Sequence, residues 1–315
     1  MSYDLAKAVG YKKEDQPVSW TKKDVITYAV GVGAKADQLS LVYGAHKAWG
    51  PLPTFPVVLP LKGTDTDVTD FSAKVDVPPP ALPKMSADRV VHGTQSIEIL
   101  RDLPAASGPG WKFQRRCVGV HENKSGIIVD NEGILVDAHG TPYAKLYSST
   151  FYLGATANHT RFSKVIAGPP QSSSSSPTPP NRAPDYTIRD KTTPEQALVY
   201  RLSGDYNPLH IDPAFGAKLG FGGVILHGLA SFGFAARGLV GAVAGGDPRA
   251  LRVFGVRFTS PVRPGDELET QAWEVGEGPG GTTEVVFVTR NVTSGKVAMG
   301  NGVAFLRKAG GRSKL

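Results

Sequence analysis

Residues 200–213 read Tyr200-Arg-Leu-Ser-Gly-Asp-Tyr-Asn-Pro-Leu-His-Ile-Asp-Pro213, and they form the richest polar cluster of this 315-residue chain. Gly204 and Pro208 disfavour a helix through the stretch, because glycine loses much backbone entropy in a helix and proline lacks the N–H group. The sequence therefore predicts a loop, and this loop carries Asp205, Asn207 and His210. The segments before and after this loop indicate the fold class.

A carboxylate and an imidazole five residues apart in a turn-rich loop can converge on one bound water. Acid–base catalysis needs two such groups of different pKa within hydrogen-bond reach of the same atom. Asn207 can orient the water or the carboxylate without titrating. A local role stays open, because Asp205 or Asp212 can instead cap a short helix. No second histidine or carboxylate group has metal-ligand spacing, so we expect no metal site.

Directly before the loop, Thr193-Pro-Glu-Gln-Ala-Leu-Val-Tyr200 has the pattern of a helix start. Thr193 would be the N-cap and Gln196 its capping-box partner. The pattern also occurs 172 positions earlier, in Thr21-Lys-Lys-Asp-Val-Ile-Thr-Tyr28, where Thr21 and Asp24 have the same roles. The constant offset indicates an internal duplication of one domain.

A serine- and proline-rich segment at 168–184 separates the two copies, because five consecutive serines and six prolines cannot form a packed element. We expect an N-terminal domain at 1–167, the linker at 168–184, a C-terminal domain at 185–309 and a tail at 310–315. In both copies turn residues separate stretches of strand character. These stretches are 89–101, 112–123, 126–138 and 142–153, then 252–260, 266–276, 282–293 and 296–307. The order predicts an α+β fold, with one long helix per half wrapped by an antiparallel sheet.

The amino-acid composition excludes some classes of function and favours others. The net charge is +7 with a pI near 9.3, but no run of five or more basic residues is present, so a nucleic-acid-binding stripe is not expected. The same charge favours an anionic ligand such as a coenzyme A thioester. The single cysteine, Cys117, excludes an intramolecular disulfide and is expected to lie buried in a strand.

Two further segments bear on location. Residues 225–244 are apolar, but they contain His227 and Arg237 and many small residues, so a buried core helix is favoured over a membrane span. The N-terminus lacks a signal-peptide pattern. The chain ends in Ser313-Lys314-Leu315, which is a peroxisomal address read by an import receptor. We therefore expect the peroxisomal matrix.

The stretch 200–217, together with Ile225-Leu-His-Gly-Leu-Ala-Ser231, resembles the hydratase 2 motif of MaoC-like, R-specific enoyl-CoA hydratases. The resemblance extends over most of 20–307, including residues 91–99 and 256–265. It implies a double hot-dog fold. It also implies that Asp205 and His210 are the acid–base pair and that Asn207 assists them.

The resemblance further implies that the backbone N–H of Gly228 faces the thioester oxygen. The physics agrees, because a helix N-terminus offers unpaired donors and favours the negative charge of an enolate. His227 is expected to have no direct role, since its neighbour Gly228 explains the motif. The substrate contacts carried over are His92, Gly93, Lys124, Tyr206, Pro208, Leu209 and Phe258. Lys124 would meet a coenzyme A phosphate, although a solvated turn lysine remains an alternative.

The offset of 172 places Gly33 and Gln38 where the second copy has Asp205 and His210, so the first half lacks the acid–base pair. We expect it to provide room for a bulky acyl chain. The implied activity is the reversible hydration of (2E)-enoyl-CoA to (3R)-3-hydroxyacyl-CoA in fatty-acid β-oxidation, with no cofactor, by a homodimer. A hot-dog thioesterase, an acyl-carrier-protein dehydratase and a non-catalytic acyl-CoA binder remain alternatives.

Overall fold

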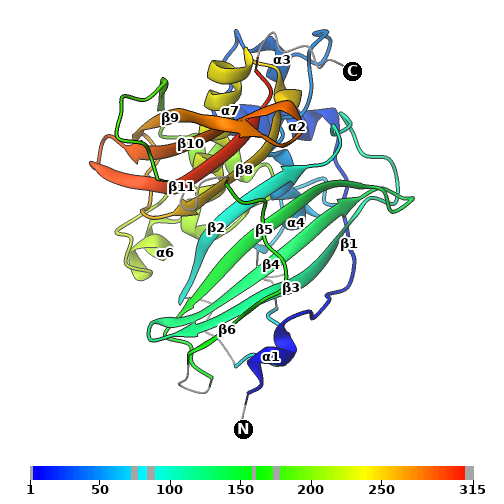
Figure 1. The fold of residues 1–315 in the computed structure, drawn as a ribbon, viewed down its shortest axis with the longest axis vertical. Coiled ribbons are helices and arrows are strands. Elements are labelled where there is room, and N and C mark those ends of the chain that lie inside the picture. The colour runs from blue at the N-terminus through cyan, green and yellow to red at the C-terminus, as the bar shows by residue number, and fades with distance from the viewer. Residues whose placement is uncertain (1–2, 72–76, 84–88, 158–160, 173–177, 309–315) are drawn as a thin grey trace.

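The computed structural model describes residues 3–71, 77–83, 89–157, 161–172 and 178–308. Eleven antiparallel strands form one sheet, and the main helices lie behind it in the view of Figure 1. The strands are β1 (Gln16–Pro17), β2 (Val90–Ile99), β3 (Lys112–Asn123), β4 (Gly126–Val136), β5 (Pro142–Leu153), β6 (Phe162–Val165), β7 (Tyr186–Lys191), β8 (Leu251–Phe258), β9 (Glu267–Gly278), β10 (Thr282–Asn291) and β11 (Lys296–Leu306). The α-helices are α1 (Leu5–Ala8), α2 (Lys22–Gly31), α3 (Leu39–Val42), α4 (Leu59–Lys62), α5 (Gln196–Arg201), α6 (Pro213–Lys218) and α7 (Gly228–Ala244).

Strands β2 and β8 join the two halves of the chain. They pair antiparallel from Thr94↔Arg257 to Glu98↔Val253. The sheet order is therefore β1-β3-β4-β5-β2-β8-β11-β10-β9-β7, with β6 added against β3. All eight predicted strands are present within a few residues of their expected bounds, which confirms the α+β class. The short edge strands β1, β6 and β7 were not predicted, because two to six residues carry little periodicity.

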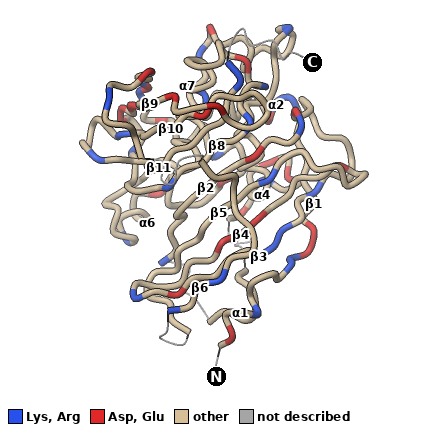
Figure 2. The backbone as a smooth tube through the Cα atoms, in the orientation of Figure 1, with Lys and Arg blue, Asp and Glu red and all other residues tan. Residues whose placement is uncertain are grey.

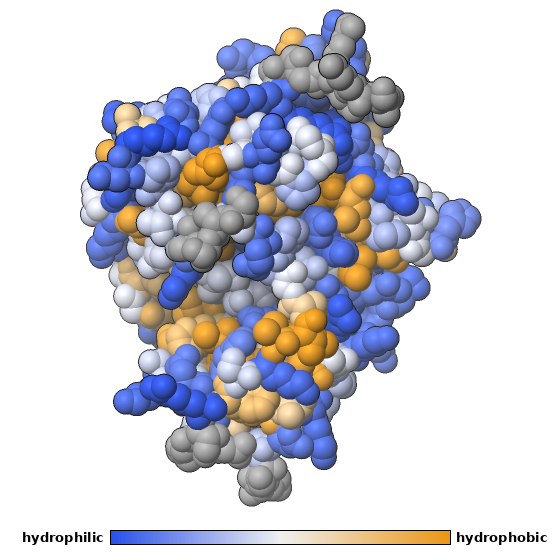
Figure 3. All heavy atoms as spheres, in the orientation of Figure 1, coloured by the Kyte–Doolittle hydropathy of each residue, from blue (hydrophilic) through white to orange (hydrophobic). Residues whose placement is uncertain are grey.

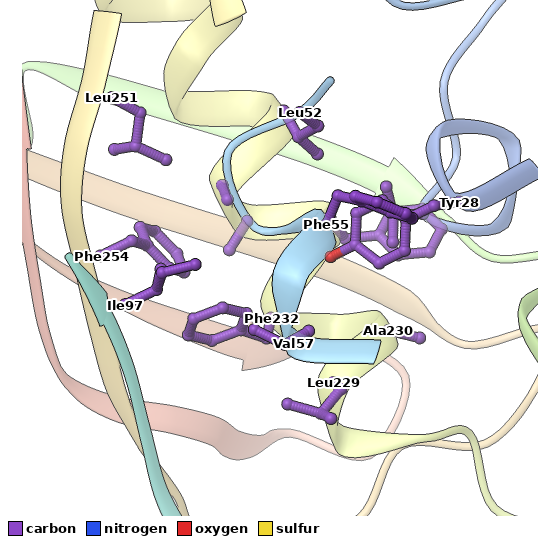
Figure 4. Close-up of a cluster of buried hydrophobic side chains, with 14 of the residues drawn as sticks. Tyr28, Leu52, Phe55, Val57, Ile97, Leu229, Ala230, Phe232, Leu251 and Phe254 are labelled. Atoms are coloured by element: carbon purple, nitrogen blue, oxygen red, sulfur yellow. The ribbon is translucent and has the colours of Figure 1, made fainter. Parts of the chain in front are cut away.

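Helix α7 forms the centre of the fold. It is apolar on nearly all sides, and almost all of its residues are buried against both halves of the chain. Figure 4 shows its residues Leu229, Ala230 and Phe232 in one cluster with side chains from the first half and the sheet. The core-helix prediction is confirmed, and within the described ranges no helix is long and apolar enough to cross a membrane.

The first half departs from the prediction of one long helix per half. Where α7 would have its counterpart, the described residues form the 3₁₀-helix η1 (Phe55–Val58) followed directly by the four-residue α4. Pro56 and Pro60 sit at the starts of these two turns, where proline is tolerated. In the interior of a long helix the same prolines would remove hydrogen bonds and clash with preceding carbonyls. The single long helix therefore serves both halves of the sheet.

Of the two N-caps that the sequence predicts, the structure has one as predicted and the other not. Thr21 and Asp24 form the predicted capping box at the start of α2. The second helix, α5, begins only at Gln196, so Thr193 is not its N-cap. The Thr193 N–H still donates to Gln196 Oε1 at 3.4 Å, as the capping-box prediction requires, while Gln196 Nε2 donates to the Gly31 carbonyl at the end of α2. The matching tyrosines of the repeat, Tyr28 and Tyr200, pack with ring centroids 6.0 Å apart. The duplicated helices thus contact each other as equivalent parts.

The described part of the segment 168–184 runs across the outer face of the sheet, the face toward the viewer in Figure 1. The Ser172 hydroxyl donates to the buried Glu284 carboxylate of β10, so this end of the segment is tied to the sheet. Cys117 is buried in β3 as predicted, and burial raises the pKa of its thiol to about 11. Figure 2 shows the basic residues spread over both halves, as their scatter along the chain implies. The tail tripeptide 313–315 lies outside the described residues.

Candidate active site

The polar loop follows α5 and is shaped by one glycine and two local caps. Gly204 has φ +121°, and a Cβ at this position would lie 2.7 Å from the Lys62 backbone. Asn207 caps the short 3₁₀-helix η4 (Pro208–His210), because its Oδ1 accepts from the Leu209 N–H at 3.0 Å. Asp212 caps α6. The local role left open by the sequence therefore belongs to Asp212 and Asn207, while the Asp205 carboxylate caps no helix.

The loop brings Asp205 and His210 together, as the sequence predicts. Their side-chain ligand atoms, with those of His227, all lie within 4.8 Å of one another. His210 is buried, and its Nδ1 donates to the Ile225 carbonyl at 2.9 Å, which leaves Nε2 as a free acceptor. Burial raises the pKa of Asp205 and lowers the pKa of His210, while each group partly offsets the shift of the other. The pair therefore combines a weakened acid and a weakened base in one small volume.

The N-terminus of α7 adjoins this pair, because its N-cap residue is His227, which lies within 4.8 Å of both side chains. Gly228 is the first residue of α7, so its N–H has no acceptor within the helix. A Cβ at Gly228 would lie 3.3 Å from the Phe258 ring, closer than a side chain normally packs. Glycine therefore fits this position without displacing the Phe258 ring. A helix N-terminus also stabilises negative charge through its dipole.

His227 is the residue whose position the sequence did not predict. It is buried, and its ring stacks on His210 with centroids 3.7 Å apart and a 28° angle between the planes. Asp205, His210 and His227 thus form a compact polar cluster in which the two imidazole rings are stacked.

The carried-over substrate contacts fall into two groups. His92 and Phe258 pack together with ring centroids 4.9 Å apart, next to Gly228. Burial lowers the pKa of His92 to about 4, and its Nε2 has no partner among the described residues. Three further contacts belong to the polar loop itself. The Arg201 guanidinium lies over the ring of one of them, Tyr206, at 5.1 Å from the ring centroid. These three are Tyr206, Pro208 and Leu209.

The second group, Gly93 and Lys124, lines a cleft of about 1200 Å³ on the outer face of the sheet. Neither Asp205 nor His210 lines this cleft. Gly93 lies at a register shift of β2 between His92 and Thr94, just beyond the last pair with β8. Gly93 therefore lies where the pairing between β2 and β8 ends. Its neighbour His92 packs on Phe258 near Gly228, and Gly93 itself lines the cleft.

Three cationic side chains line the cleft, against the two carboxylates of Glu122 and Asp130. Lys124, Arg161 and Arg257 line it, and none of them forms an ion pair within the part of the chain that the structure describes. Asp130, which also lines it, is held by His121 at 2.9 Å and by the Ser149 hydroxyl at 2.6 Å. Figure 3 shows this face of the molecule, where hydrophobic residues form separate patches among hydrophilic ones. Such a cleft favours a polar, anionic ligand.

Comparison with known proteins identifies the class. Residues 18–154 match the MFE-2 hydratase 2 N-terminal domain, and residues 175–296 match the MaoC-like domain. A MaoC-like dehydratase from Phytophthora capsici is 32% identical with a TM-score of 0.83, over 97% of this chain and 99% of that one. A Mycobacterium tuberculosis protein described as a double hot-dog fold has a TM-score of 0.56 at 12% identity, over 94% and 95% of the two chains, and shows the fold alone.

Curated relatives agree. The probable dehydratase NIT22 of Ajellomyces capsulatus is 33% identical over 92% of this chain and 79% of its own length. The peroxisomal enoyl-CoA hydratase 2 of Arabidopsis thaliana is 31% identical over 85% and 86%. The peroxisomal multifunctional enzyme type 2 of Mus musculus is 32% identical over 97% of this chain, which spans 39% of that longer enzyme.

The fold and the site together define a double hot-dog enzyme of the hydratase and dehydratase class. The chain belongs to the MaoC-like enoyl-CoA hydratase 2 family.

Proposed function

We propose that this chain hydrates (2E)-enoyl-CoA reversibly to (3R)-3-hydroxyacyl-CoA in peroxisomal fatty-acid β-oxidation. One observation carries the proposal: the Asp205 and His210 side chains converge beside His227, the N-cap residue of α7. An acid–base pair beside a helix N-terminus is what the addition of water to an unsaturated thioester requires. The names of the hydratase 2 relatives support the same reaction class.

The reaction follows from these groups. A water held by Asp205, Asn207 and His210 adds its oxygen to C3 of the enoyl group, and one of the two titrating residues takes the proton. Electrons of the double bond move toward the thioester oxygen, where the Gly228 N–H and the α7 dipole stabilise the enolate. A proton returned to C2 completes the hydration. His210 can accept a proton at Nε2, because its Nδ1–H is held by the Ile225 carbonyl. No metal or organic cofactor takes part in this scheme.

The coenzyme A end of the substrate would leave the catalytic pair beside His92 and Phe258 and pass Gly93 toward the outer cleft. The three unpaired cations of the cleft, Lys124 among them, suit its phosphate groups. Tyr206, Pro208 and Leu209 would border the thioester end. The first half, which has no long helix of its own, would provide room for the acyl chain.

Location and assembly are part of the proposal. Relatives named as peroxisomal support a peroxisomal role, and Ser313-Lys314-Leu315 would be read by the import receptor. Removing these three residues should leave hydration in vitro unchanged and the protein cytosolic in cells. The chain would work as a homodimer, and the 1–167, 168–184, 185–309 and 310–315 segments would be its domains, linker and tail.

The deciding experiment incubates the purified chain with crotonyl-CoA, follows the loss of enoyl-thioester absorbance and identifies the product's stereochemistry. Loss of absorbance with an R product and no free thiol is the expected result. Release of free thiol would indicate a thioesterase instead. Turnover only on acyl-carrier-protein thioesters would indicate a dehydratase of that substrate class, and binding without turnover a non-catalytic acyl-CoA binder.

A further inference from the structure

His227 connects the two parts of the site. It is the N-cap residue of α7 and directly precedes Gly228. Its Nε2 lies 3.1 Å from the backbone carbonyl oxygen of Asp205. One side chain therefore links the loop that carries the carboxylate to the helix end that would face the thioester.

The protonation of His227 follows from this contact. A carbonyl oxygen only accepts hydrogen bonds, so Nε2 carries the proton and donates it. The other ring nitrogen, Nδ1, is buried without a hydrogen-bond partner among the described residues. Burial lowers the pKa of His227 well below its ordinary value, with a smaller contribution from His210. The ring is therefore the neutral Nε2–H tautomer.

The ring is also fixed on both faces. It stacks on His210 at 3.7 Å between centroids and packs on Tyr200 at 4.8 Å. Tyr200 belongs to α5, whose rings and side chains pack against α2 of the first half. A shift of His227 would therefore move His210 and release the Asp205 carbonyl together.

The first copy of the duplication shows which residue the packing requires at the position of His227 when no acid–base pair is present. The offset of 172 places Phe55 at the position of His227, and Phe55 packs on Tyr28 as His227 packs on Tyr200. The first copy has Gly33 and Gln38 in place of the acid–base pair. An aromatic ring is thus common to both copies, while the ring N–H occurs only in the copy that carries Asp205 and His210.

We propose that His227 is a positioning residue, whose Nε2–H holds the Asp205 backbone and whose ring holds the His210 imidazole in the geometry needed for hydration. The inference rests on the proposed hydratase function. His227 is almost wholly buried, so in this proposal it acts on the transition state through the two residues that it holds.

The test compares full-length wild type, His227→Phe and His227→Gln with crotonyl-CoA. Phenylalanine keeps the ring that the first copy uses but has no donor. The glutamine amide nitrogen reaches about as far as Nε2 and can donate to the same carbonyl. We expect kcat of His227→Phe to fall about tenfold to a hundredfold, because small misplacements of acid–base groups have effects of this size. KM and Tm should stay near the wild-type values, and His227→Gln should recover part of the loss in kcat.

Phe55→His is the matched control, because it places an imidazole in the equivalent packing position away from the acid–base pair. It should lower Tm without changing kcat. Wild-type kcat in His227→Phe, or equal losses in the Phe and Gln variants, would overturn the positioning role. An inactive wild type would remove the proposed function instead, and ¹⁵N NMR separates the two cases: the His227 imidazole should be the neutral Nε2–H tautomer at pH 7. A protonated ring or an Nδ1–H tautomer would contradict the inference whatever the activity.

Discussion

At the scale of single residues, the site combines the half-buried Asp205 carboxylate with the buried His210 imidazole. The carboxyl pKa of Asp205 is raised and the imidazole pKa of His210 is lowered, in each case mainly by burial. Asp205 accepts from the Asn207 N–H and His210 donates to the Ile225 carbonyl, but among the described residues neither side chain caps a helix or forms an ion pair. Their convergence beside Gly228 is therefore best explained by chemistry on a bound ligand.

Replacing the Asp205 carboxylate or the His210 imidazole tests their proposed roles in acid–base catalysis directly. Asp205→Asn and His210→Ala should each lower kcat by at least about 100-fold, because acid–base groups contribute effects of this size. Hydration of crotonyl-CoA gives kcat, and circular dichroism checks that the fold is intact. Near-normal turnover in either folded variant would show that the residue is not part of the acid–base pair.

The buried histidines also predict a pH dependence of stability. Burial lowers the pKa of His92 to about 4, and the pKa values of His210 and His227 are lowered as well. In the unfolded chain these groups take up protons near pH ~6.5. Below that value the unfolded state binds more protons than the folded state, so the free energy of unfolding falls as the pH falls toward the folded pKa values.

Tm should therefore drop between pH 6.5 and 4, and the drop should be smaller in His227→Phe, which has one buried imidazole fewer. Differential scanning calorimetry across this range measures both curves. Parallel curves for the two proteins would mean that His227 does not titrate differently in the folded and unfolded chains.

At the scale of elements, helix α7 depends on glycines where other parts of the chain come close. A Cβ at Gly233 would lie 2.3 Å from the Val32 Cγ1 atom at the end of α2. Gly241, in the same helix, is exposed and has nothing within 4 Å of such a Cβ. Small residues thus allow the single long helix to pack on both halves.

Gly233→Ala should lower the free energy of unfolding by about 1–3 kcal/mol, because an added methyl overpacks the contact with α2. Gly241→Ala is the control and should raise it by up to about 1 kcal/mol through helix propensity. Urea unfolding measures both. A neutral Gly233→Ala would mean that α2 and α7 can separate without cost.

At the scale of the whole molecule, the first half completes the fold. The positions in it that correspond to Asp205 and His210 leave no space for a second site. Gln38, at the position of His210, accepts a hydrogen bond from Arg237 of α7, which also pairs with Asp190. A Cβ at Gly33, at the position of Asp205, would lie 2.2 Å from the Phe234 ring. Packing and an ion pair therefore occupy the place that the proposed acid–base pair has in the second half.

Residues 185–307 expressed alone should be insoluble or inactive. The fragment would expose the β8 edge that pairs with β2, and the hydrophobic core shared by both halves. Solubility, size-exclusion chromatography and hydration assays on short and bulky enoyl-CoA substrates test this. A soluble fragment with full activity on both substrates would show that the first half is dispensable, whereas activity on short chains alone would support its role in accommodating the acyl chain.

The sequence alone determined the strands, the repeat and the polar loop, because these depend on local signals. Alternating and turn residues place the eight main strands, and Gly204 and Pro208 mark the loop. The duplication is visible because Thr21 and Tyr28 recur at a fixed offset. The Asp205–His210 pair was found for the same reason, since its members lie five residues apart in one segment.

Only the tertiary structure decided how distant segments share space. The sequence of the first half has the residues of a duplicate, yet prolines between 51 and 60 leave its long helix unformed, and α7 fills the centre for both halves. The contacts of His227 were not predicted, because its hydrogen bond to Asp205 and its stack on His210 connect residues 17 to 22 positions apart. Such contacts leave no periodic or spacing pattern in the chain, because they are set by the packing of α5, α7 and the loop against one another.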